Sequence, residues 1–260
     1  MRRKVFLQRA WLVILLLGGS TIILAQGYYF EATTKSDEAH RFYEQAVEAF
    51  YRTEYPQMFE LTERALKADP EFFMGYVLGS FHFQADKKEW YLNKVVQHKG
   101  RLNKGERIIK QMAEDLIVDS QASITQYWKE IIKKYPDNLQ LMAMWSFMLF
   151  NQDGQEKKTI WALDECLKLK ANLPFVYKFR GYIFLKREQF EKAEYAFNRY
   201  VWLVPEMGNP YDSKGDYYMA IKDYDNAIDN YRRAYELNSG NSHSLEKMEA
   251  AKMYNDSSGY

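Results

Sequence analysis

The chain has 260 residues, of which 47% are hydrophobic, so it is long enough to bury a sizeable core. Six prolines and thirteen glycines are too few for a turn-rich β protein, and helix-forming residues fill most of the chain. After residue 25 the chain carries 32 basic and 35 acidic residues with both signs mixed. This balance gives no electrostatic footprint for nucleic acid, and we predict an all-α protein that does not bind it.

The N-terminus has a composition of its own. Arg2, Arg3, Lys4 and Arg9 precede an uncharged run over residues 10–25, and aromatic residues follow it at positions 28–30. Residues 1–30 are therefore predicted to be either a signal peptide or an N-terminal membrane anchor. A buried core helix is a weaker interpretation, because the basic cluster has no use in a core.

Both interpretations place residues after 30 on the non-cytoplasmic side of a membrane, as in a bacterial cell envelope. Cleavage after Ala25 would give a periplasmic or secreted protein. Without cleavage the protein would be anchored in the inner membrane, with residues 10–30 in contact with lipid. Residues 31–38 are expected to form a linker.

Later in the chain, residues 177–200 and 211–234 repeat each other at a constant offset of 34 residues. The offset aligns Gly181 with Gly215 and Phe197 with Tyr231. This pattern resembles the tetratricopeptide repeat (TPR), in which a small residue in the first helix and an A-x3-F pattern in the second recur. Extending the register backwards puts these residues in the glycine column: Ala46, Gly79, Met112, Ser146, Gly181 and Gly215.

The same register divides the rest of the chain. Six TPR-like repeats are predicted over residues 39–240, with a helix boundary near Leu102 and Asn103, and residues 241–260 form a capping helix and tail. Three prolines end second helices, at Pro70, Pro136 and Pro205.

The resemblance implies a right-handed superhelical α-solenoid of antiparallel helix pairs, with the C-terminal capping helix and an N-terminal apolar helix. It also implies that Phe184, Phe190 and Phe197 fill the space between helices as packing residues.

In this family the first helices form a concave wall that binds extended peptides or helices of partner proteins. The resemblance implies a partner-binding groove made of these residues: Tyr43, Phe50, Tyr76, Phe83, Phe147, Phe150, Lys178, Tyr182, Asp212 and Asp216. Alternatively, the superhelix itself or the N-terminal segment covers some of them. The Lys and Asn pair that clamps a carboxylate in some members is missing, because Tyr43 and Val47 occupy its places in the first repeat.

Residue patterns for catalysis are weak. The four histidines show no metal-ligand spacing, and the single cysteine, Cys166, falls on a packing column and can form no intrachain disulfide. We therefore expect no enzyme activity, cofactor or metal. The sequence favours an exported, non-enzymatic TPR scaffold for a peptide or helix of a partner protein. The alternative is a membrane-tethered structural or assembly factor of an envelope complex.

Overall fold

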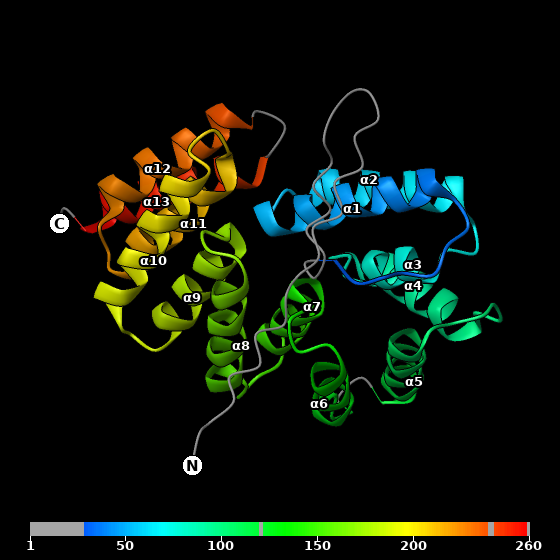
Figure 1. The fold of residues 1–260 in the computed structure, drawn as a ribbon. Helices are drawn as coiled ribbons and strands as arrows, with labels where there is room; N and C mark the ends of the chain where they lie inside the picture. The colour runs from blue at the N-terminus through cyan, green and yellow to red at the C-terminus, as the bar shows by residue number, and fades with distance from the viewer. Residues whose placement is uncertain (1–28, 120–121, 239–241, 259–260) are drawn as a thin grey trace, which may run out of the picture.

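The structure is a computed structural model that describes residues 29–119, 122–238 and 242–258, and Figure 1 shows its helices. In this part of the chain all the regular structure is helical. The helices are α1 (Asp37–Arg52), α2 (Tyr55–Ala68), α3 (Phe73–Gly79), α4 (Ala85–Gln97), α5 (Lys104–Val118), α6 (Thr125–Lys134), α7 (Leu139–Phe150), α8 (Glu156–Leu169), α9 (Pro174–Lys186), α10 (Phe190–Leu203), α11 (Gly208–Ala220), α12 (Tyr224–Leu237) and α13 (Ser242–Ser258). They form six successive pairs with α13 packed on the last one, which confirms the predicted α-solenoid.

Capping side chains fix where several helices begin. Asn103 caps α5 and forms a capping box with Glu106, because each side chain bonds the other residue's backbone N–H. This confirms the boundary expected near Leu102 and Asn103. Ser36 accepts a hydrogen bond from the N–H of Ala39 at 3.1 Å and thereby starts α1.

At two positions of the glycine column, an aromatic ring of the second helix packs directly against the backbone of the first helix. A Cβ atom added to Gly181 would lie 2.5 Å from Phe197, and one added to Gly215 would meet the ring of Tyr231 in the same way. These positions need glycine because a side chain would overlap the ring. Phe197 is buried as expected, but Phe190 is 39% exposed, so its assignment to the packing is wrong. It is the first residue of α10, and its side chain stays partly exposed at this helix end.

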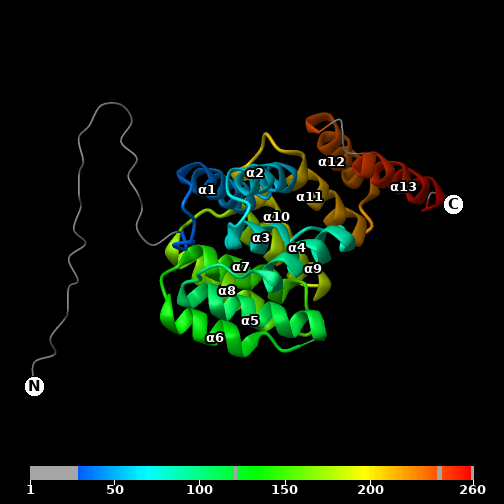
Figure 2. The same ribbon diagram turned by 90° about the vertical axis from the view of Figure 1, so that its right-hand side faces the viewer.

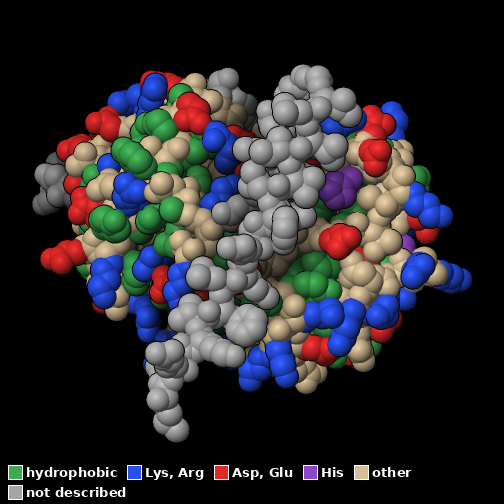
Figure 3. All heavy atoms as spheres, in the orientation of Figure 1, with side chains coloured by type: hydrophobic (Ala, Val, Ile, Leu, Met, Phe, Trp, Pro, Cys, Tyr) green, Lys and Arg blue, Asp and Glu red, His purple; other side chains and the backbone are tan. Residues whose placement is uncertain are grey.

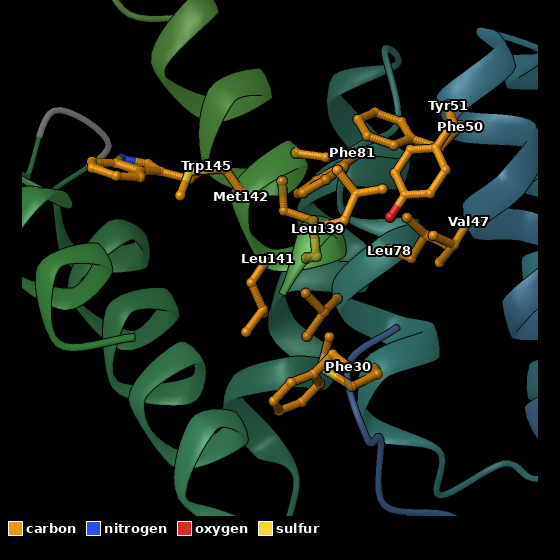
Figure 4. Packing of buried hydrophobic residues seen from close by; sticks show 14 of the residues in the cluster. Phe30, Val47, Phe50, Tyr51, Leu78, Phe81, Leu139, Leu141, Met142 and Trp145 are labelled. Atoms are coloured by element: carbon orange, nitrogen blue, oxygen red, sulfur yellow. The ribbon is translucent and has the colours of Figure 1, made fainter. Parts of the chain in front are cut away.

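Helix α7 lies in the middle of the fold. It is hydrophobic around most of its circumference, and every residue from Leu139 to Ser146 is buried. Figure 4 shows residues of α1 and α3 directed toward it, among them Phe50 and Leu78. The ring of Phe50 lies 5.7 Å from that of Phe147 on α7 and 6.2 Å from that of Phe81.

The solenoid curls so far that its first repeat meets the fifth and sixth (Figures 1 and 2). Phe50 of α1 stacks on Phe175 of α9 with ring centroids 5.6 Å apart. At the end of α1, the hydroxyl of Thr53 is hydrogen-bonded to that of Tyr200 on α10, and its carbonyl accepts from Asn209 at 2.8 Å. The first repeat therefore closes part of the concave side.

A short extended segment completes this closure, and we call residues 29–34 the N-terminal strap. Phe30 is buried against Tyr135 with ring centroids 5.4 Å apart, and its N–H donates to the side chain of Gln140 at 3.0 Å. Thr33 donates to the buried carboxylate of Glu106. These bonds hold the first half of the predicted linker, residues 31–38, against α5, and α1 begins at Asp37.

Within the described residues, no helix is long and apolar enough to cross a bilayer. The predicted signal peptide or N-terminal anchor covers residues 1–30, of which residues 1–28 lie outside the part of the chain that the structure describes.

Candidate partner-binding groove

The structure does not leave the whole predicted wall open. Tyr43 and Phe50 are each only 1% exposed, so the expectation that they face an open groove is wrong. Tyr43 packs edge-on against Phe72, and its hydroxyl accepts a hydrogen bond from Gln140 of α7. Helix α1 is covered because the solenoid curls back onto it.

Tyr76 and Phe83 belong to the second repeat. Tyr76 is half-buried, donates its hydroxyl hydrogen to the carbonyl of Pro70 at 2.8 Å, and lines a 440 Å³ pocket with Trp90. Phe83 is 65% exposed and lies edge-on to Tyr55, with ring centroids 5.0 Å apart. Phe83 is therefore one of the predicted groove residues that remain accessible to a partner.

The aromatic residues of α7 differ in accessibility. Phe147 is half-buried and stacks on Phe81 at 4.9 Å, so part of its surface belongs to the core. Phe150 stacks on Phe179 at 4.5 Å and, with Tyr182, lines a pocket of 280 Å³ between the α7–α8 connection and α9. At this place two predicted groove residues share one concavity.

The charged residues of the last repeats form a network. The hydroxyl of Tyr182 donates to Asp216 at 2.7 Å and is hydrogen-bonded to the hydroxyl of Ser213 at 3.1 Å. Lys247 of α13 bridges Asp212 at 2.7 Å and Asp216 at 2.8 Å. The two carboxylates also accept hydrogen bonds from Ser244 and Tyr231. Asp212 and Asp216 thus share the single ammonium of Lys247.

Lys178 stands apart from this network. It is half-buried, and its ammonium lies 4.8 Å from the ring centroid of Tyr55, a cation–π contact. No carboxylate of the described residues lies within ion-pair distance of it. Burial lowers the pKa of Lys178 to about 8, although the charges of Asp212 and Asp216 oppose the shift.

We call Phe150, Lys178, Tyr182, Asp212 and Asp216 the C-terminal groove. Sequence reasoning found these five through the repeat register, but it missed the residues that hold them. Lys247 and Ser244 belong to the helix that was expected only to cap the array, and Tyr55 begins α2. No periodic signal marks these three positions, because the contacts cross between different helix pairs.

Residues with reactive side chains lie elsewhere. Cys166 is fully buried, and burial raises the pKa of its thiol. Burial lowers the pKa of both His82 and His98. No group of three or more His, Cys, Asp or Glu residues within the described part of the chain could hold a metal ion.

Comparison with known proteins adds to this geometry. No protein-family model matches the sequence, and no curated protein matches it. Among solved structures, the APC/C hetero-tetramer Cut9-Hcn1 matches with a TM-score of 0.51 at 12% identity, over 82% of this chain and 42% of that one. A double mutant of MamA RS-1 matches with a TM-score of 0.50 at 18% identity, over 59% and 86%. A thermophilic TPR protein of Thermus thermophilus has a TM-score of 0.49 at 13% identity, over 83% and 99%.

The paired helices, their stacking and the concave side define the class of the protein, an α-solenoid. The two structures with TM-scores of 0.50 and 0.51 support this architecture, and the repeat of about 34 residues is that of the TPR. The chain therefore has the TPR fold. At these identities the similarity shows the fold alone.

Proposed function

We propose that the protein is a non-enzymatic TPR scaffold that binds a segment of a partner protein in its C-terminal groove. One observation carries the proposal. The Lys178 side chain makes no ion pair within 4 Å in the described chain, and it lies one helical turn before Tyr182, which lines the 280 Å³ pocket. A segment with an apolar side chain and a carboxylate would fill the pocket and pair with the ammonium.

The burial of the first repeat's side of the concave surface also supports a binding site in the C-terminal groove. Tyr43 and Phe50 are buried by the chain itself, so a partner has access to the later repeats and to the exposed Phe83. The scaffold would then bind a short segment rather than a long one that follows the whole superhelix. Its place would be the non-cytoplasmic side of the bacterial membrane, a proposal supported by the composition of residues 1–25.

A second candidate function is a membrane-tethered assembly factor of an envelope complex. The N-terminal strap favours it, because the predicted tether, residues 10–30, would end within a segment that is bonded to Gln140 and Glu106. A force on the tether would therefore act directly on the helical repeats. N-terminal sequencing of the native protein tests this candidate, since a chain that starts at Gln26 has no tether.

Photocrosslinking in living cells tests the groove. A photoreactive phenylalanine analogue at Gln152, which lines the 280 Å³ pocket, should crosslink a partner protein. The same analogue at Tyr195, which is 64% exposed on α10, serves as the control. We expect K178M to weaken the crosslink at Gln152 while the helical circular dichroism signal is unchanged. Equal crosslinking from both positions, or a crosslink insensitive to K178M, would overturn the assignment.

A further inference from the structure

A basic surface lies where the α4–α5 connection meets its two helices, and we call its five residues the basic edge. They are Lys94, Lys99, Arg101, Lys104 and Arg107, and all are exposed. Figure 3 shows Lys and Arg side chains on the lower right of the molecule, over the region where Figure 1 labels α5 and α6. We propose that the basic edge docks on the anionic lipid surface of a membrane. This inference rests on the membrane-tethered form of the proposed function.

The cations of the basic edge are available to an outside anion. In the described part of the chain, the closest carboxylate contact of these five is Lys104 to Glu130, at 3.9 Å. Arg107 donates to the carbonyl of Leu102 at 2.6 Å, which leaves its charge uncompensated. The adjacent Glu106 is fully buried and bonded to the strap. The positive potential is therefore directed outward, as binding to anionic headgroups requires.

An exposed aromatic residue lies beside these cations. Trp90 is 52% exposed, one helical turn before Lys94, whose ammonium lies 5.4 Å from the ring centroid. A tryptophan flanked by lysine suits the boundary between headgroups and acyl chains, where one part of the indole is apolar and its N–H needs a polar partner. Basic residues alone would also suit an acidic polypeptide, and Trp90 favours lipid.

The position of the strap brings the basic edge near the apolar run. The side-chain amide of Asn103 donates to the carbonyl of Glu31 at 2.8 Å, so the chain enters the fold between Arg101 and Lys104. Only six residues lead from Ala25 to Glu31, and they span at most about 20 Å. An apolar run held in a bilayer would therefore keep the basic edge close to the headgroups, at a high effective concentration.

Fluorescence quenching of the full chain in vesicles tests the proposal. A fluorophore is placed on Gln97→Cys, at the end of α4, or on Tyr195→Cys as the control position, since the native Cys166 is buried. The vesicles contain a quencher-bearing lipid with either phosphatidylcholine alone or added phosphatidylglycerol, and flotation confirms that the chain is inserted. We expect quenching at Gln97→Cys to be about fivefold stronger with the anionic lipid and to fall with salt.

Charge variants decide between outcomes. Replacing Lys99, Arg101, Lys104 and Arg107 with Gln should reduce quenching to the level of the neutral vesicles. Replacing Lys192, Lys222, Arg232 and Arg233 with Gln removes as many charges elsewhere and should leave it unchanged. Equal quenching in neutral and anionic vesicles would overturn the proposal. Binding of polyglutamate instead of anionic lipid would also overturn it. If the crosslink at Gln152 is absent but the quenching at Gln97→Cys is as expected, the proposed groove is refuted and the proposed membrane contact is not.

Discussion

The buried carboxylate of Glu106 holds Thr33 by two hydrogen bonds, from its N–H at 2.8 Å and from its hydroxyl at 2.6 Å. Glu106 also accepts a hydrogen bond from the N–H of Asn103 at 2.8 Å, so one carboxylate belongs both to the capping box of α5 and to the contact with the strap. A charged group with no exposure is tolerated because each of these bonds compensates its lost hydration. This pair joins the N-terminal strap to a repeat 73 residues further along the chain.

The strap should loosen when the hydroxyl of Thr33 is removed. Thr33→Val keeps the shape of the side chain but loses one bond to Glu106, which we expect to lower the free energy of unfolding by about 1–2 kcal/mol. Urea denaturation measures this loss, and hydrogen exchange should be faster in residues 29–35. Thr33→Ser retains the hydroxyl and is the matched control. Equal stability of Thr33→Val and the native chain would contradict the role of this bond.

The contact of Gly181 with Phe197 predicts the effect of a single methyl group. Gly181→Ala gains about 1 kcal/mol in helix propensity but places a Cβ 2.5 Å from the ring. Overpacking costs about 1–3 kcal/mol, so we expect net destabilisation in urea. Adding Phe197→Leu should recover part of the loss, because the clash is with the ring. Additive effects of the two substitutions would show that they do not interact.

Closure of the solenoid depends on Tyr200. Its hydroxyl meets that of Thr53 inside the fold, where neither group is accessible to water. Tyr200→Phe leaves the hydroxyl of Thr53 without this partner and should cost about 1–2 kcal/mol. Tyr195→Phe removes a hydroxyl from a residue that is 64% exposed and should change the urea midpoint little. A midpoint equally insensitive to both would indicate that the closure contributes no stability.

Lys178 predicts a pH dependence of stability. Its pKa is about 8 in the fold and 10.5 ordinarily, so between these values the unfolded chain binds more protons than the folded one. The free energy of unfolding therefore rises with pH in this window, and the cost of burying the ammonium is fully present below pH 8. K178M removes that cost and should stabilise the protein by about 1–2 kcal/mol at pH 7.

The comparison of K178M with the native chain should be made by urea denaturation from pH 6 to pH 10. Tyrosine titration is common to both proteins and cancels in the difference. We expect the advantage of K178M to shrink as pH rises above 8. An advantage that stays constant across the range would mean that Lys178 keeps its ordinary pKa in the fold.

Cys166 should be inert in the native protein. It is fully buried, and its raised pKa leaves little thiolate, which is the reactive form. A maleimide at pH 8 should therefore label it slowly in buffer and rapidly in urea, as followed by mass spectrometry. Rapid labelling in buffer would show that α8 opens readily.

The repeat register predicted the local packing well. Gly181, Gly215, Phe197 and Tyr231 meet as the 34-residue offset requires, because those contacts are between neighbouring helices of one pair and depend on local sequence. The register was less informative at Gly79. The spacing of 16 residues from Gly181 to Phe197 predicts Val95 as its packing partner, but a Cβ atom at Gly79 would meet the ring of Tyr91. In the second repeat the expected position carries no aromatic residue, and the ring of Tyr91 fills the space beside Gly79 instead.

By itself the sequence determined the α-solenoid and the register of its repeats, since the same packing recurs about every 34 residues. Only the tertiary structure decided which of the predicted groove residues stay accessible. Tyr43 and Phe50 are buried because the solenoid curls until α1 reaches α7 and α9, and Phe30 and Thr33 bind repeats far along the chain. The small rotation between successive helix pairs accumulates over six repeats. No single repeat encodes that sum, and therefore the closure of one half of the groove and the opening of the other are properties of the whole array.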